Sequence, residues 1–526
     1  MGAYEQGRDD EYLARLDTSI SKFINRYNAN LSSSNRRTIF LFPGGMGSQL
    51  AQATSDYTSG PPFSYDDIWL NCATVFGAAI NLQMHGDIDY GDCYIVPDGC
   101  VDFPPLLQPY DDFISWCQAN SLDLFVFGWD WRRDVSDTVD FFLNKFLPKF
   151  KNRVASAGCT PNPLDDFTLL SHSFGGLVVK LILNKAGNYY VQKMKRAITV
   201  AAPFYGYGGQ VHRYFKGDPD LNADPFYGAT TVTEVVSTCP GPYELMFLDG
   251  ATYDANKTAF QNDPDGYNLT SYPSVDATTG QRADSYNPIP GKPTPGSTGR
   301  VRYISNHKFD WQLLTDALPV RTSVASKLSP GIAAKFYNIR GVQTAYGADV
   351  AGTVVGQTWS LARRKFKPDS DKDPIVDSFG SGDGVIPAWS ARFAFLSNQV
   401  KTVTGDFEHM TMMNYQPVQS AIWELLGLPM NAMKPVRAKK MAAATRADLN
   451  QFLQGLKALG VKKQSPKQRA IAVRKYLQKF DPERLQAFLG RVYLDLLKSP
   501  SQKTGLFARK GRGGAQRKPK GGSRRR

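Results

Sequence analysis

Residues 165–180 place a serine in a short turn between an apolar strand and an apolar helix, and no other stretch constrains the fold as strongly. Phe167–Leu170 predicts a buried strand, residues 171–175 (SHSFG) fit the pattern small-x-Ser-x-Gly, and residues 176–182 predict a helix. Such a strand, turn and helix form a nucleophile elbow, which holds a serine hydroxyl, here that of Ser173, above a parallel sheet. Ser171 stands where the first glycine is usual. Taken alone, the pentad also fits an ordinary structural turn.

Short β-branched and aromatic runs elsewhere predict the remaining strands of such a sheet. They lie at residues 38–42, 123–127, 195–201, 335–340 and 400–403. We therefore predict an α/β fold with a mostly parallel sheet and flanking helices.

The chain is long enough for several parts. We predict a helical leader (1–36), a catalytic domain (37–430), a small basic helical appendage (431–499) and a disordered basic tail (500–526). Within the catalytic domain, residues 51–110 are predicted to form a lid and residues 206–300 a cap, because the latter stretch is too long for a plain loop. The aromatic run at 63–71 favours a lid or lipid contact about as much as core packing.

A glycine-rich turn, PGGMGSQL at residues 43–50, follows the first predicted strand. In an α/β-hydrolase this position supplies one backbone amide of the oxyanion hole, and the amide after the nucleophile, here that of Phe174, supplies the other. A phosphate-binding loop is less favoured because no Lys-Ser/Thr follows the glycines. A tight turn without function is the remaining interpretation. Asp130 and Arg132 in the GWDWRR run are expected to form a structural ion pair.

Two later turns carry an acid and a histidine. Asp383 lies between glycines, and His409 follows the last predicted strand, so the chain order is Ser173, Asp383, His409. That is the order that α/β-hydrolases use. A histidine activates a serine by taking its proton, and an acid behind it fixes the tautomer. Asp406 and Glu408 are rival acids, although neighbours of the base are badly placed to reach its Nδ1. No metal constellation is present in the sequence, and no cofactor is expected.

Charge is unevenly spread along the chain. From residue 431 to the end there are 26 Lys and Arg against four Asp and Glu, a net of +22, whereas the remainder holds 36 basic and 44 acidic residues, a net of −8. This basic segment is expected to meet an anionic membrane surface, with nucleic acid a less favoured partner and a solvated tail the alternative without function. The oligomeric state is not indicated.

Targeting signals are not evident. No apolar run is long enough to span a membrane, and the N-terminus has acids where a signal peptide needs a basic and then an apolar stretch. The six cysteines are scattered, so free thiols in a reducing compartment are expected. We predict a cytoplasmic protein, with peripheral membrane attachment left open.

Several motifs together resemble the lecithin:cholesterol acyltransferase family of the α/β-hydrolase superfamily, which includes lysosomal phospholipase A2 and phospholipid:diacylglycerol acyltransferase. They occur in the family's order over about residues 35–415. The matching stretches are FLFPGGMGSQL (40–50), DIWLN (67–71), GWDWRRD (128–134), SHSFGG (171–176), APFYG (202–206), CPGPYELM (239–246), GDGVIP (382–387) and EHM (408–410).

The resemblance implies a role for each matching residue. Ser173 is the implied nucleophile, Asp383 the orienting acid and His409 the base. Gly45 and Phe174 are the implied oxyanion amides, and Trp69 and Met46 belong with the substrate or lid. The implied activity is acyl transfer from a phospholipid-type ester to an alcohol or to water. Two alternatives stay open: a soluble carboxylesterase or lipase, and an inactive member that binds lipid or nucleic acid.

Overall fold

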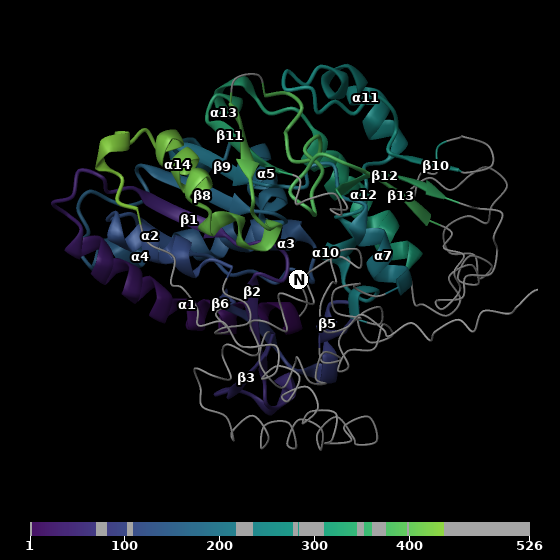
Figure 1. The fold of residues 1–526 in the computed structure, drawn as a ribbon. Coiled ribbons are helices and arrows are strands. Elements are labelled where there is room, and N and C mark those ends of the chain that lie inside the picture. The colour runs from purple at the N-terminus through teal and green to yellow at the C-terminus, as the bar shows by residue number, and fades with distance from the viewer. Residues whose placement is uncertain are drawn as a thin grey trace, which may run out of the picture.

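The fold is an α/β arrangement built on a six-stranded sheet in which every neighbouring pair is parallel (Figure 1). The computed structural model describes residues 3–69, 82–101, 109–216, 235–276, 282, 310–344, 352–359, 375–396 and 399–435. The strand order is β14-β11-β9-β8-β1-β7. The strands are β1 (Thr38–Phe42), β7 (Asp123–Val126), β8 (Phe167–His172), β9 (Arg196–Val200), β11 (Phe336–Gln343) and β14 (Val400–Gly405).

All six strands of this sheet were predicted from the sequence, and the predictions are confirmed to within a few residues at each end. The first strand is buried at every position, as its uninterrupted apolar run indicates. It lies between β7 and β8, with Phe40 opposite Phe125 on one side and Leu169 on the other. The nucleophile elbow therefore leaves the sheet next to the strand that ends in the glycine-rich turn.

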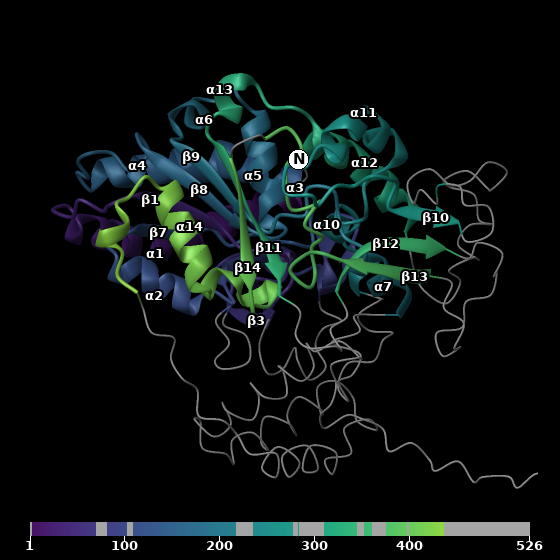
Figure 2. The ribbon, with the colours of Figure 1, turned by 45° about the horizontal axis from the view of Figure 1, so that its top comes forward.

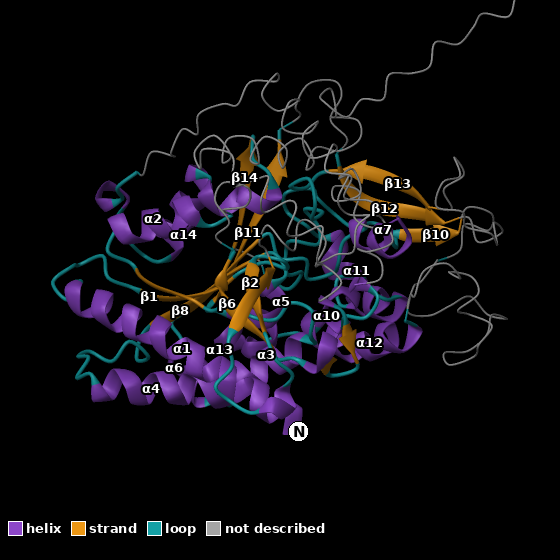
Figure 3. Ribbon diagram, turned by 90° about the horizontal axis from the view of Figure 1, so that it is seen from below, coloured by secondary structure: helices purple, strands orange, loops and turns teal. Residues whose placement is uncertain are grey.

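Alternate residues of β1 enter two hydrophobic cores, one on each face of the sheet. Phe40 and Phe42 pack with α1 (Ala3–Ala29), α3 (Val135–Phe141), α4 (Leu147–Ser156) and α5 (Gly175–Asn184). Ile39 and Leu41 pack with α2 (Asp111–Ala119) and α14 (Gln416–Leu425). Figure 3 shows these two helical layers on either side of the central strands. Burial on both faces explains why the central strand β1 reads as a continuous apolar run rather than an alternating one.

Two smaller three-stranded sheets were not predicted. One is antiparallel, in the order β3 (Tyr65–Trp69), β2 (Ser48–Ala53), β6 (Ile95–Cys100). The other has the order β10 (Ser274–Asp276), β12 (Thr353–Trp359), β13 (Ile375–Gly380), and lies to one side of the main sheet (Figure 2). A two-stranded ribbon pairs β4 (Met84–His85) with β5 (Ile88–Asp89).

The remaining helices of the described residues lie in the connections between these strands. They are α6 (Tyr189–Lys193), α7 (Gly209–Lys216), α10 (Pro240–Tyr243), α11 (Gly250–Gln261), α12 (Trp311–Ala325) and α13 (Pro330–Ala333). Short 3-10 or π turns are η1 (Tyr57–Ser59), η4 (Tyr90–Asp92), η5 (Phe142–Phe146), η8 (His409–Asn414) and η9 (Met430–Ala432).

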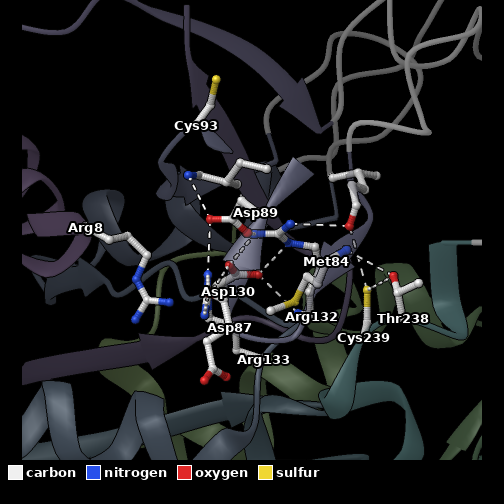
Figure 4. A network of polar contacts seen from close by, with 12 residues as sticks. Arg8, Met84, Asp87, Asp89, Cys93, Asp130, Arg132, Arg133, Thr238 and Cys239 are labelled. Carbon is white, nitrogen blue, oxygen red and sulfur yellow. Dashed lines mark hydrogen bonds and ion pairs between the residues drawn. The ribbon is translucent and has the colours of Figure 1, made fainter. Parts of the chain in front are cut away.

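A network of buried ion pairs links the segment around β5 to residues 130–133 (Figure 4). Arg132 contacts both oxygens of Asp130, with Nε at 2.9 Å and Nη2 at 2.6 Å, so the expected ion pair is confirmed. Its Nη2 also lies 2.7 Å from Asp89. Arg133 contacts the same Asp89 at 3.1 Å, and the hydroxyl of Tyr4 in α1 donates to Asp89 at 2.7 Å. Three segments distant in sequence thus share one set of charges.

Several predicted segments fall wholly or partly outside the described residues. Residues 70–81 and 102–108 of the predicted lid lie outside them, as do residues 217–234, 277–281 and 283–300 of the predicted cap. The same holds for the tail predicted at 500–526 and for all but residues 431–435 of the helical appendage. The division into domains stays a prediction.

Candidate active site

Ser173 stands at a sharp reversal between β8 and α5. Its φ is +52°, a left-handed conformation that is unfavourable for residues other than glycine. The turn is possible because the chains around it approach closely. A Cβ on Gly175 would lie 2.5 Å from the carbonyl oxygens of Phe42 and Pro43, and one on Gly176 would lie 2.2 Å from the Cβ of Ala202. Any side chain at either position would force the elbow away from the neighbouring strand ends.

His409 lies within hydrogen-bond distance of both its predicted partners. Its Nε2 is 2.8 Å from the Oγ of Ser173, and its Nδ1 is 2.7 Å from the Oδ2 of Asp383. The histidine is 4% exposed and the aspartate 1% exposed. Water therefore competes little for either contact, which strengthens them electrostatically. Three side chains from a span of 236 residues thus form one continuous hydrogen-bonded chain.

Asp383 is held by its own turn and by the end of β11. Its Oδ1 accepts hydrogen bonds from the backbone amides of Val385 at 3.0 Å and Ile386 at 2.7 Å, which leaves Oδ2 for His409. The amide of Gln343, the last residue of β11, donates to the carbonyl of Gly382 at 2.8 Å. The side chain of Gln343 donates to the carbonyl of Phe407 at 2.7 Å. One strand end thereby fixes both the acid turn and the loop that precedes the histidine.

The two predicted oxyanion residues lie on adjacent turns. A Cβ on Gly45 would lie 3.0 Å from the Cδ1 of Phe174, so the turn after β1 packs directly on the elbow. Within the described part of the chain, neither the amide of Gly45 nor that of Phe174 has a hydrogen-bond acceptor. The neighbouring amide of Gly44 is occupied, because it donates to the hydroxyl of Tyr110 at 2.7 Å. The assignment of Gly45 and Phe174 to an oxyanion hole stays a prediction.

Trp69 and Met46 contact each other beside this turn. The indole Nε1 of Trp69 donates to the backbone carbonyl of Met46 at 2.8 Å, and its ring meets Trp131 edge-on at 5.5 Å. Trp69 is 5% exposed, so its ring packs in the core. The residues that follow it, 70–81, lie outside the described part. A role for Trp69 and Met46 toward substrate or as part of a lid stays a prediction.

Two further residues lie at the site, Tyr110 and His172. The sequence analysis did not predict a place for Tyr110 there, nor the contacts that His172 makes. The Nδ1 of His172 is 3.0 Å from the hydroxyl of Tyr110, and its Nε2 is 3.0 Å from the backbone carbonyl oxygen of His409. Burial, together with the neighbouring His409, lowers the pKa of His172 well below the ordinary value. The position of His172 directly before the nucleophile was a usable signal, whereas nothing in the sequence around Tyr110 connects it to the site.

Across the residues that the structure describes, no group of three His, Cys, Asp or Glu side chains is arranged to hold a metal ion. No described helix is both long enough and apolar enough to cross a membrane. Five cysteines are free thiols, namely Cys93, Cys100, Cys117, Cys159 and Cys239.

Comparison with known proteins gives two relatives from Arabidopsis thaliana. The first, "Lecithin-cholesterol acyltransferase-like 4", is 28% identical over 141 residues, which cover 26% of this chain and 25% of that protein. The second, "Phospholipase A(1) LCAT3", is 23% identical over 341 residues, which cover 60% of this chain and 67% of that protein. The chain is a distant relative of the lecithin-cholesterol acyltransferase-like family. The family relationship predicted from the motifs is thereby confirmed, at low identity.

The relationship to the acyltransferase-like family is partial. The chain aligns with a quarter of the first relative's length and about two thirds of the second's. No family model matches the chain. Among solved structures, a chain of the Tle4–Tli4 complex is similar, with a TM-score of 0.42 and 11% identity over 77% of this chain and 99% of that one.

Proposed function

We propose that this protein is an α/β-hydrolase that transfers an acyl group from a lipid ester, of the phospholipid type, to an alcohol or to water through an acyl-enzyme at Ser173. The observation that carries the proposal is the hydrogen-bonded chain from Ser173 through His409 to Asp383. The all-parallel sheet and the positive φ of Ser173 fit this assignment. The relatives bear names that refer to acyl transfer and to phospholipase activity, and they guide the choice of lipid esters as substrates.

In the first half of the proposed reaction, the Oγ of Ser173 bonds to the ester carbonyl carbon while its proton passes to the Nε2 of His409. The carbonyl π electrons move to the oxygen, and the amides of Gly45 and Phe174 are proposed to stabilise that charge. The carbon–oxygen bond to the leaving group then breaks, and the leaving oxygen takes the proton from His409. The products are an acylated serine and a free alcohol.

In the second half, an acceptor hydroxyl gives its proton to His409 as its oxygen bonds to the acyl carbon, and Ser173 leaves with that proton. A water acceptor gives a fatty acid, and an alcohol acceptor gives a new ester. The proposed task of Asp383 is to stabilise the imidazolium and hold its orientation. Met46 and Trp69 adjoin the Gly45 turn, and we propose that this segment, which holds them together, lies on the substrate or lid side of the site.

A fluorophosphonate probe tests the nucleophile directly. We expect covalent labelling of the native protein at Ser173, identified by mass spectrometry of the labelled peptide, and none in Ser173→Ala or in heat-denatured protein. Incubation with mixed phospholipids and candidate alcohols, followed by mass spectrometry of the products, then separates transfer from hydrolysis. Failure of the native protein to label would favour an inactive lipid- or nucleic-acid-binding protein. Rapid turnover of short soluble esters with none of dispersed phospholipid would favour a soluble carboxylesterase.

We also propose that the basic segment from residue 431 onward binds anionic membrane surfaces. Its net charge of +22 contrasts with −8 for the rest of the chain, and each basic residue near an anionic membrane contributes about 1 kcal/mol. A chain ending at residue 430 is expected to lose sedimentation with phosphatidylserine vesicles at physiological salt, while the full chain retains it and loses it at high salt. Unchanged vesicle binding after truncation would contradict this proposal. Retention of RNA rather than vesicles would assign the segment to nucleic acid.

A further inference from the structure

A second chain of hydrogen bonds passes behind the nucleophile. It runs from the amide of Gly44 to the hydroxyl of Tyr110 at 2.7 Å, from that hydroxyl to the Nδ1 of His172 at 3.0 Å, and from the Nε2 of His172 to the carbonyl oxygen of His409 at 3.0 Å. Tyr110 and His172 are each 1% exposed. Buried polar groups of this kind are costly unless every member has a partner, and here every member has one.

The position of each proton follows from the chemistry of the end groups. A carbonyl oxygen only accepts, so the Nε2 of His172 carries the proton that it donates to His409. The Nδ1 of a neutral imidazole is then an acceptor, and Tyr110 donates its hydroxyl proton to it. The Tyr110 oxygen in turn accepts from the amide of Gly44. Every bond therefore has one direction, and burial keeps the His172 ring neutral by lowering its pKa.

This chain joins two parts of the site that must be fixed relative to Ser173. One end lies at Gly44, next to the Gly45 amide, and the other lies at the backbone of the proposed base, His409. The rings of His172 and His409 also pack together, with centroids 4.9 Å apart and an angle of 34° between their planes. The middle of the chain is the residue directly before the nucleophile. Displacement at any member would therefore move the base, the amide turn or both.

Helix α2 adds a second attachment to the same loop. Tyr110 immediately precedes α2, and the amide of Phe113 in its first turn donates to the Oδ1 of Asn414 at 2.9 Å. Asn414 is the last residue of η8, the short helix that begins at His409. The start of α2 consequently holds η8 at both of its ends, once through His172 and once directly.

We propose that Tyr110 and His172 are positioning residues that keep the His409 backbone and the Gly44–Gly45 turn in register around Ser173. This inference rests on the proposed function for its catalytic consequence. Neither side chain needs to touch the substrate or exchange a proton in the reaction. Reacting atoms misplaced by about 1 Å lose on the order of 10²-fold in rate, which sets the size of the effect to look for.

Tyr110→Phe removes a single oxygen and leaves the amide of Gly44 and the Nδ1 of His172 each without a hydrogen-bond partner. We expect kcat for a lipid ester, and the rate of fluorophosphonate labelling, to fall about 10- to 100-fold while KM changes little. His172→Gln retains a donor for the His409 carbonyl, so it is expected to keep more activity than His172→Phe. Tyr110→Phe combined with His172→Phe should be no slower than His172→Phe alone, because both remove the same connection.

Tyr27→Phe is the matched control. Tyr27 is equally buried, and its hydroxyl donates to the carbonyl of Pro161 at 2.5 Å, in a part of α1 away from the site. It is expected to leave kcat unchanged even if it lowers the melting temperature as much as Tyr110→Phe does. A Tyr110→Phe protein with kcat within twofold of wild type would overturn the inference. So would an equal loss in Tyr27→Phe.

Amide hydrogen exchange decides the matter without any enzyme activity. Peptides covering residues 43–47 and 405–414 are expected to exchange faster in Tyr110→Phe than in the wild type, and to be unchanged in Tyr27→Phe. A native protein that neither labels nor turns over lipid esters would refute the proposed function, while faster exchange in these two peptides would still support the positioning role. Unchanged exchange in both peptides would refute that role even in an active enzyme.

Discussion

Asp383→Asn is expected to lower kcat for a lipid ester about 10⁴-fold while the protein stays folded. The reason lies in the way the carboxylate is held. Its Oδ1 accepts two backbone amides, those of Val385 and Ile386, so the amide oxygen of an asparagine takes that position. The asparagine NH₂ then faces the Nδ1 of His409, which has to become an acceptor. The proton moves to Nε2, and that nitrogen can no longer accept the proton of Ser173.

Asp406→Asn is the control for this prediction. Asp406 is a rival acid from the sequence, three residues before His409, and its side chain is exposed. We expect its kcat to stay within about twofold of wild type, because no tautomer depends on it. Steady-state kinetics, labelling rates and melting temperatures of both variants decide the point. An Asp383→Asn protein with more than a tenth of the wild-type kcat would refute the assignment of Asp383 as the acid that orients His409. A large loss of kcat in Asp406→Asn would assign that role to Asp406 instead.

The centre of the main sheet was predictable because β1 and β8 are buried on both faces. A run such as Thr38–Phe42 has no polar residue that must reach water, so it stands out from any helix or loop. The strands of the smaller sheets lack this signal. β2 (Ser48–Ala53) and β6 (Ile95–Cys100) contain polar, proline and glycine residues, and they pair through irregular registers. Their pairing depends on tertiary contacts that local pattern does not encode.

Some residues of the candidate site could likewise be predicted from the sequence, and others could not. Ser173, Asp383 and His409 each follow a strand or lie in a glycine turn, so position along the chain was enough to nominate them. Tyr110 comes from a polar, proline-rich stretch and reaches the site only because α2 packs against η8. Trp69 lies in an aromatic run that equally fitted core packing or a lid. The hydrogen bond from its indole to Met46, 23 residues away, helps to hold the ring in the core. No local pattern predicts that contact.

Arg132→Met is expected to lower the free energy of unfolding by about 3–5 kcal/mol, the usual cost of removing one partner from a buried ion pair. Arg132 is fully buried and contacts Asp130 and Asp89 at once. Methionine fills similar space without charge, so Arg133 is left as the cation for two buried carboxylates. Urea unfolding at neutral pH measures the change. Arg282→Met is the control, because its pair with Asp254 is exposed and screened by water, so a much smaller loss is expected.

A second substitution separates charge from packing. In the Arg132→Met protein, Asp130→Asn restores one cation to one anion and is expected to recover more than about 1 kcal/mol.

Burial raises the pKa of Asp89, but Arg132 and Arg133 outweigh it and hold the pKa below its ordinary value. The lowered pKa of Asp89 adds to the free energy of unfolding at neutral pH. This contribution is lost as the pH falls, since the unfolded chain binds the proton first. Arg132→Met should therefore lose less stability than the wild type on acidification. Equal acid sensitivity, with no recovery by Asp130→Asn, would mean that Arg132 acts through its volume alone.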